Sequence, residues 1–108
     1  MNIPDTLKVG GSTYKVSIVP DIMDSANPDG RIRFSSQTIE VKETASHEFM
    51  QKVFLHEMIH AIHEHIGLVS ADVRPREDEV DALANALHMV IQDNPRMFER
   101  RYEPAAKG

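Results

Sequence analysis

Apolar and polar residues alternate along roughly the first forty positions, which is the two-residue period of β-strands with one buried face. Two such runs flank the pair Gly10-Gly11, which suits a two-residue hairpin turn, and two more flank residues 35–37. The expected strands span residues 7–9, 14–19, 31–34 and 38–42. We therefore expect a small, mainly antiparallel sheet of three or four strands.

The period then lengthens to that of an α-helix. Ser46 suits the N-cap of a helix that runs to about Ile66 and stops at Gly67. Apolar residues fall on both sides of this helix, so we expect it to be packed between two other layers. One stripe comprises Phe54, Leu55, Met58, Ile59, Ile62 and Ile66, and the opposite face carries Phe49, Val53, His56, His60 and His63.

A second helix is expected to start near Pro75, which suits a first turn and precedes several acidic residues. Its apolar stripe comprises Val80, Leu83, Ala84, Leu87 and Ile91. Asn94-Pro95 predicts a stop, and Met97, Phe98 and Tyr102 predict a short C-terminal helix. The whole chain, residues 1–108, is thus expected to be a single domain of the α+β class.

The first helix contains the segment His56-Glu57-Met58-Ile59-His60. Histidines four residues apart lie on one helix face, where they can hold one metal ion, and Glu57 could take a proton from metal-bound water. The chain has no cysteine, so a zinc ion would need histidine and carboxylate ligands. Because unpaired imidazoles are costly inside an apolar helix layer, the setting favours Zn²⁺ over a chance occurrence of the motif.

A catalytic zinc needs a third protein ligand. His63 lies about 10 Å from His56 along the helix axis, too far to complete the same site easily. Glu77, at the start of the second helix, lies nearer the buried stripe than the alternative, Glu79. Asp81 is one turn further on and could accept a hydrogen bond from a ligating histidine.

Other histidines are expected to be structural or surface residues: His47, His63, His65 and His88. A peptidase also needs a hydrogen-bond donor for the oxyanion of its tetrahedral intermediate. Tyr102, His63 and His88 are the candidates, and the sequence does not choose among them.

The segments His56–Ala61 and Glu77–Ala84 together resemble the small gluzincin-type zinc metallopeptidases of the ImmA/IrrE-like group, often encoded in phages. The resemblance covers about half the chain. It implies a minimal zincin-like domain in which His56, His60 and Glu77 bind zinc and Glu57 is the catalytic base. SprT-like proteases and metzincins fit less well, because their third-ligand histidines are missing here.

The charge and hydropathy of the chain limit the classes of partner that we expect it to bind. The chain has 12 basic and 17 acidic residues, and no basic block stands out, so we expect no binding to nucleic acid. There is no signal-peptide pattern and no apolar run of membrane-spanning length, so we expect a cytoplasmic protein without a membrane partner.

The expected function is therefore a zinc endopeptidase acting on a protein or peptide. Its substrate would pair with an exposed sheet edge, either residues 31–34 or residues 37–41. Two alternatives remain: a zinc-binding interaction module without catalysis, and a zinc hydrolase acting on RNA or a small molecule.

Overall fold

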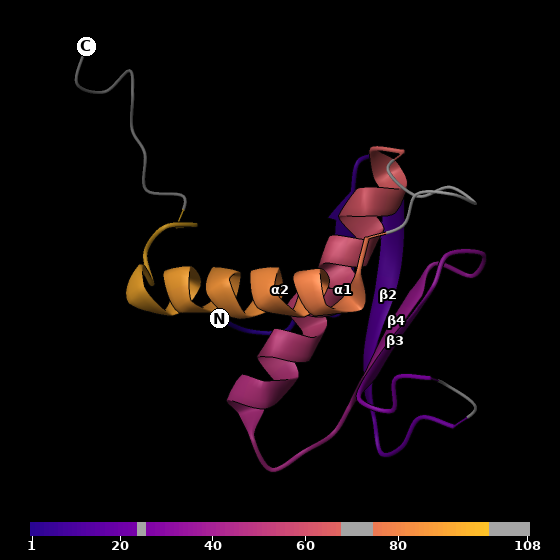
Figure 1. The fold of residues 1–108 in the computed structure, drawn as a ribbon, viewed down its shortest axis with the longest axis horizontal. Coiled ribbons are helices and arrows are strands. Elements are labelled where there is room, and N and C mark those ends of the chain that lie inside the picture. Colours follow the sequence, from indigo (N-terminus) through magenta and orange to yellow (C-terminus); the bar gives the residue numbers. More distant parts are fainter. Residues whose placement is uncertain (24–25, 68–74, 100–108) are drawn as a thin grey trace.

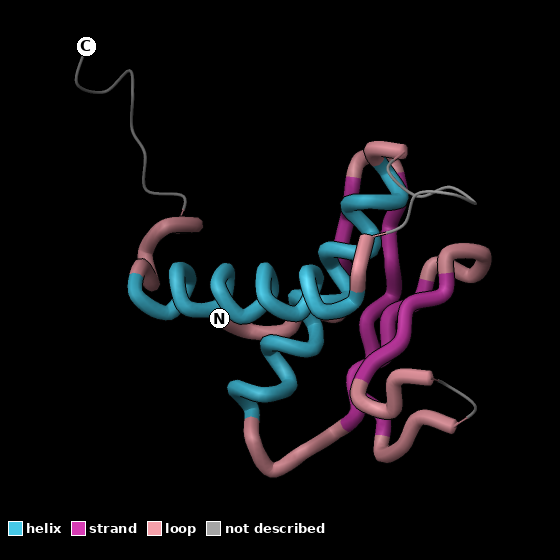
Figure 2. The backbone as a smooth tube through the Cα atoms, in the orientation of Figure 1, coloured by secondary structure: helices cyan, strands magenta, loops and turns pink. Residues whose placement is uncertain are grey.

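The computed structural model describes residues 1–23, 26–67 and 75–99 (Figures 1 and 2). Four strands precede two helices, which confirms the expected α+β class. The elements are β1 (Thr6–Val9), β2 (Ser12–Val19), β3 (Gly30–Arg33), β4 (Thr38–Lys42), α1 (His47–His65) and α2 (Glu77–Asp93).

The strands form one sheet in the order β1-β2-β4-β3. The β1–β2 and β3–β4 pairs are antiparallel, as expected, but the central β2–β4 pair is parallel, with Val16 opposite Ile39. The sheet is therefore mixed. Because β4 is paired on both sides, residues 37–41 offer no free edge to a substrate, whereas β3 lies at the edge of the sheet.

Glycine is required at the turn between β1 and β2. Gly10 has a φ of 60°, and a β-carbon there would lie 2.0 Å from the His65 ring at the end of α1. Glycine adopts this left-handed backbone conformation without strain, and a larger residue would also displace the exposed His65 ring.

Helix α1 is packed between the sheet and α2, which crosses it in Figure 1, so the expected sandwich is confirmed. The core joins all three layers. Its buried members are Tyr14, Val16, Ile39 and Val41 from the sheet, Met50, Phe54, Leu55, Ile59 and Ala61 from α1, and Val80 and Ala84 from α2.

The ends of α1 lie where the sequence predicts them. The Ser46 side chain accepts a hydrogen bond of 3.1 Å from the Phe49 amide, and Gly67 follows the helix with a φ of 75°. The apolar stripe is shorter than expected. Ile62 and Ile66 are 38% and 56% exposed, because no described element covers that side of the last turn.

Helix α2 begins at Glu77 with Arg76 as its N-cap, so Pro75 precedes the helix and is not in its first turn. The expected stripe is also shifted around the helix. Leu83 is 52% exposed, whereas His88 is only 3% exposed. Burial of His88 is possible because its Nε2 lies 2.8 Å from Oε1 of Gln51 on α1, a partner that the sequence does not reveal.

The expected C-terminal helix is not present among the described residues. Residues 95–98 form a turn in which the Met97 amide donates to the Asn94 carbonyl at 3.0 Å. Met97 and Phe98 are 47% and 72% exposed, so they lack the buried face that would stabilise a short helix. Tyr102 lies outside the described residues. No described helix is both long and apolar enough to cross a membrane.

Candidate metal centre

Three side chains from two helices converge where α2 begins beside α1. His56 and His60 lie one turn apart on α1, with their Nε2 atoms 3.2 Å apart. Glu77 is the first residue of α2, and its two carboxylate oxygens lie 3.0 Å from Nε2 of His56 and 3.1 Å from Nε2 of His60. His56 is buried, His60 is half-buried and Glu77 is open to solvent.

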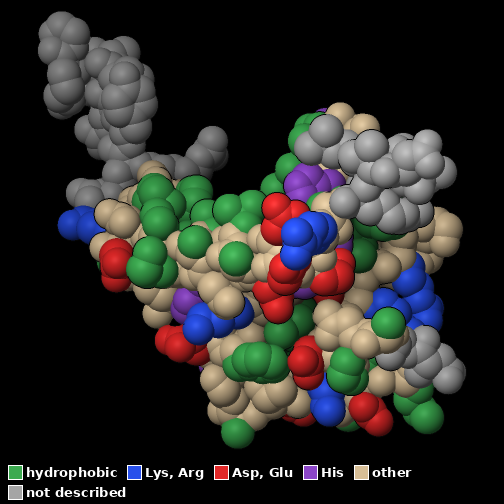
Figure 3. Space-filling model, in the orientation of Figure 1, with side chains coloured by type: hydrophobic (Ala, Val, Ile, Leu, Met, Phe, Trp, Pro, Cys, Tyr) green, Lys and Arg blue, Asp and Glu red, His purple; other side chains and the backbone are tan. Residues whose placement is uncertain are grey.

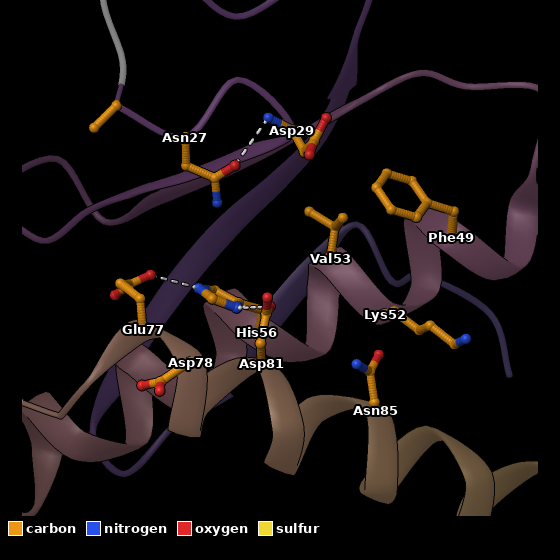
Figure 4. Close-up of a pocket in the computed structure, with 11 residues that line it drawn as sticks. Asn27, Asp29, Phe49, Lys52, Val53, His56, Glu77, Asp78, Asp81 and Asn85 are labelled. Atoms are coloured by element: carbon orange, nitrogen blue, oxygen red, sulfur yellow. Dashed lines mark hydrogen bonds and ion pairs between the residues drawn. The ribbon is translucent and has the colours of Figure 1, made fainter.

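Asp81 lies behind His56, one turn after Glu77 on α2 (Figure 4). Its carboxylate is 2.8 Å from Nδ1 of His56, and because an ionised carboxylate only accepts, Nδ1 must donate. The Nε2 lone pair of the neutral ring then points toward Glu77 and His60. Asp81 therefore fixes both the tautomer and the orientation of His56.

The donor set fits a small divalent cation. Two imidazole nitrogens and a carboxylate oxygen face one another, and when both rings are neutral with their hydrogen on Nδ1, all three atoms offer a lone pair to a cation. Zinc–ligand bonds of about 2.0–2.2 Å put neighbouring donors of a tetrahedral site roughly 3.3–3.6 Å apart. The observed separations of 3.0–3.2 Å need to widen by only a few tenths of an ångström.

Glu79, the alternative third ligand, points elsewhere. Its carboxylate lies 3.9 Å from Nε of Arg76, and no described residue connects it to the histidines. The sequence already places Glu77 nearer the buried stripe than Glu79, and the observed shift of that stripe on α2 increases the difference. Burial of His88 in place of Leu83 rotates the core-facing side of α2 toward the flank that carries Glu77.

Glu57 is 3% exposed and directly follows His56 on α1. A β-carbon added to Gly30, at the start of β3, would lie 2.9 Å from its Oε2 atom. The pKa of Glu57 is raised to about 7, mainly by burial; His56 opposes the rise, and the carboxylates of Glu77 and Asp81 contribute to it. A carboxyl group with this pKa can exchange a proton near neutral pH.

Burial also lowers the pKa of His60, against the raising influence of Glu77. A depressed pKa keeps the imidazole neutral, which is the form that binds a metal. His60 therefore has both the position and the protonation state of a ligand.

The remaining histidines lie outside the cluster. His47 and His65 are exposed, and His65 packs against Gly10. His88 is buried against Gln51, so it is a core residue and not a candidate for the oxyanion. His63 is half-buried, and its Nδ1 atom has no hydrogen-bond partner among the described residues.

A cleft of about 730 Å³ adjoins His56 and Glu77 (Figure 4). Its walls come from three segments: the loop before β3, the first half of α1 and the first half of α2. Phe49 and Val53 provide apolar surface, and Asp29, Asp78 and Asp81 make most of the charged surface acidic.

Two functional contributions are not evident from the sequence pattern. Gly30 makes room for Glu57 and Val53, and the only hint is its place just before an expected strand. Gln51 also connects layers, because its side-chain nitrogen donates to the Met1 carbonyl while its oxygen contacts His88. No sequence signal identifies that link.

Comparisons with protein-family models, with curated proteins and with solved structures find no match for this chain.

Proposed function

We propose that this protein is a zinc-dependent metallopeptidase related to the ImmA/IrrE-like gluzincins. The observation that carries the proposal is the convergence of His56, His60 and Glu77, with the buried Glu57 beside them. A site that only stabilised the fold would have no use for a buried carboxylate with a pKa of about 7.

His56, His60 and Glu77 would hold the zinc ion, and Asp81 would keep His56 in the required tautomer. When bound, zinc lowers the pKa of a water molecule and polarises a carbonyl group. Glu57 would take the proton of the attacking water as the new C–O bond forms, and would then pass it to the leaving amine as the peptide C–N bond breaks.

An extended substrate would pair with the outer edge of β3. The edge is unpaired among the described strands, and it begins at Gly30, next to Glu57. A peptide paired there would pass the carboxylate that activates water. The cleft lined by Phe49 and Val53 would then receive a neighbouring substrate side chain.

The first test combines elemental analysis of purified protein with a peptide-library cleavage assay. We expect about one zinc per chain, lost in Glu77→Ala and kept in Glu79→Ala, which serves as the matched control. Loss of zinc in both variants, or in neither, would contradict the ligand assignment.

Glu57→Gln separates catalysis from metal binding. We expect it to keep zinc and to lower kcat/KM by roughly 100- to 10,000-fold, the usual effect of removing a general base. If the wild type binds zinc but cleaves no peptide, the alternative of a non-catalytic zinc-binding interaction module is favoured. Cleavage of nucleotides or small molecules alone would favour a different hydrolase.

A further inference from the structure

The outer face of the sheet collects basic side chains that are scattered along the sequence. Successive strand residues point to opposite faces, so the buried Tyr14, Val16, Ile39 and Val41 define the inner face. The strand register places six charged side chains on the outer face: Lys8, Lys15, Arg31, Arg33, Glu40 and Lys42. Five are basic and one is acidic, although the chain as a whole has a net charge of −5.

Most of this positive charge is not neutralised locally. Glu40 is engaged by Arg31, whose Nε lies 2.9 Å from its carboxylate. No described carboxylate lies within ion-pair distance of the other four basic side chains, which are Lys8, Lys15, Arg33 and Lys42. Both helices lie on the opposite side of the sheet, with α1 packed against the strands and α2 packed against α1 (Figure 1), and Figure 3 shows basic side chains on the strand side.

The register also sets the spacing of the charges. Lys15 and Arg33 lie in one row across the sheet, separated by Thr38 on β4. With strands about 4.8 Å apart, their α-carbons are roughly 10 Å apart, and those of Arg31 and Arg33 are about 7 Å apart along β3. The basic side chains are therefore spread over the surface of the sheet and do not converge on one point, as they would in a pocket for a small anion.

Hydroxyl groups fill the spaces between these cations. The outward positions of the strands carry Thr6, Thr13, Ser17 and Thr38, and their one apolar residue is Val19. Lys, Arg, Ser and Thr side chains are the usual contacts to nucleic-acid phosphates. Protein interfaces instead need an apolar or aromatic centre, and interfacial membrane binding needs an apolar face.

We propose that the outer face of the sheet binds the phosphate backbone of a nucleic acid without reading its sequence. None of the outward-facing positions of the four described strands carries an aromatic side chain that could stack on exposed bases, so a duplex is favoured over a single strand. The sequence-based expectation of no nucleic-acid binding depended on the absence of a basic block along the chain. The sheet assembles such a block from four strands.

The acidic residues do not prevent this binding. Glu77, Asp78 and Asp81 line the cleft, which lies on the helix side of the sheet. Exposed charges more than about 8 Å apart are largely screened at physiological salt. A polyanion approaching the outer face would therefore meet mainly the basic side chains there.

The test is fluorescence anisotropy of the full chain with a labelled DNA duplex of about 20 base pairs and mixed sequence. If the four unneutralised cations contact phosphates, Kd should rise about 100-fold between roughly 50 and 200 mM salt. Absence of binding at the lower salt, or binding that salt does not weaken, would overturn the proposal. Single-stranded DNA of equal length should bind more weakly, and tighter binding of the single strand would contradict the preference for duplex.

Matched variants locate the surface. Lys15→Glu should weaken binding about tenfold at low salt and reduce the salt slope by about 1. Arg96→Glu makes the same charge change at an exposed residue away from the sheet, and it should alter Kd less than twofold. Equal effects of the two variants would show that binding depends only on the net charge of the chain, and would overturn the assignment of DNA binding to the outer face of the sheet.

Two further measurements make the test independent of folding and of the peptidase proposal. Glu40→Gln removes the acidic residue from the face and should tighten binding, a gain that misfolding cannot produce. Glu57→Gln should bind DNA as the wild type does.

A competition experiment tests the class of ligand. Displacement of the duplex by poly-glutamate at equal charge concentration would assign the face to acidic proteins and overturn the nucleic-acid proposal.

Discussion

The cleft between the helices and the outer face of the sheet use charge in opposite ways. In the cleft, imidazole and carboxylate groups point at one another over about 3 Å and partly exclude water. On the sheet, like charges lie apart in solvent and share no common centre. Convergent groups suit a compact ligand such as a metal ion, whereas dispersed groups suit an extended polyanion.

The two regions also differ in what holds their side chains in place. His56 is clamped between Asp81 and Glu77, and α1 is itself fixed by the sheet and α2. Lys8, Lys15 and Arg33 are exposed and have no described ion-pair partner. Substitutions should therefore act through geometry in the cleft and through simple charge on the sheet.

Among the variants that compare these two ways of holding side chains, the largest expected effect on binding concerns Asp81. Asp81→Asn removes the carboxylate that orients His56 but leaves all three candidate ligands in place. Zinc affinity should fall about 10- to 100-fold, measured by competition with a chelator. Asp78→Asn, on the same helix and bound to Arg76, is the matched control and should leave zinc affinity unchanged. Equal losses in both variants would mean that general acidity, not orientation, sets the affinity.

The next effect is expected in stability, at Gly30, where the cleft and the sheet meet. In Gly30→Ala the new methyl group would lie 2.5 Å from Cγ1 of Val53 and 2.9 Å from Oε2 of Glu57. Such overpacking should cost about 1–3 kcal/mol in the free energy of unfolding, measured by urea titration. Gly11→Ala meets no atom within 4 Å and should cost much less. Equal costs would show that the space beside Glu57 is not tight.

The smallest expected effect is a pH dependence of the free energy of unfolding, and it comes from the buried His88. Burial lowers the pKa of His88, so the unfolded chain binds a proton more readily than the folded chain does. Stability from the neutral His88 is fully present above the unfolded pKa of about 6.5, and it is lost as the pH falls below that value. Urea titrations between about pH 8 and 5.5 should show that the free energy of unfolding falls less steeply with decreasing pH in His88→Gln than in the wild type. An identical slope would mean that other groups set the acid sensitivity.

Local patterns in the sequence were sufficient for much of the fold. Alternation predicted the four strands, and Ser46 and Gly67 predicted the ends of α1, because these signals depend on neighbours a few residues apart. The parallel pairing of β2 with β4 could not be predicted in this way. It depends on which strands meet in space, and no local pattern records that choice.

The same distinction between local signals and tertiary contacts applies to the residues of the metal site. The spacing of His56, Glu57 and His60 fixes their relation on one helix, and the acidic start of the second helix indicated where a third ligand could come from. The sequence also placed Glu77 nearer the expected buried stripe than Glu79, and the rotation of α2 brings Glu77 closer still to the core-facing side. That rotation is set by the burial of His88 against Gln51, a contact between residues 37 positions apart.

By itself, the sequence determined which residues share a strand or a helix face, because backbone periodicity is a local property. It therefore determined the paired histidines of α1 and the alternation of the strands. Only the tertiary structure decided which faces meet. It brought Glu77 and Asp81 to the histidines, placed Gly30 beside Glu57, and assembled Lys8, Lys15, Arg33 and Lys42 on one surface. These arrangements depend on packing between layers, which no segment of the chain specifies alone.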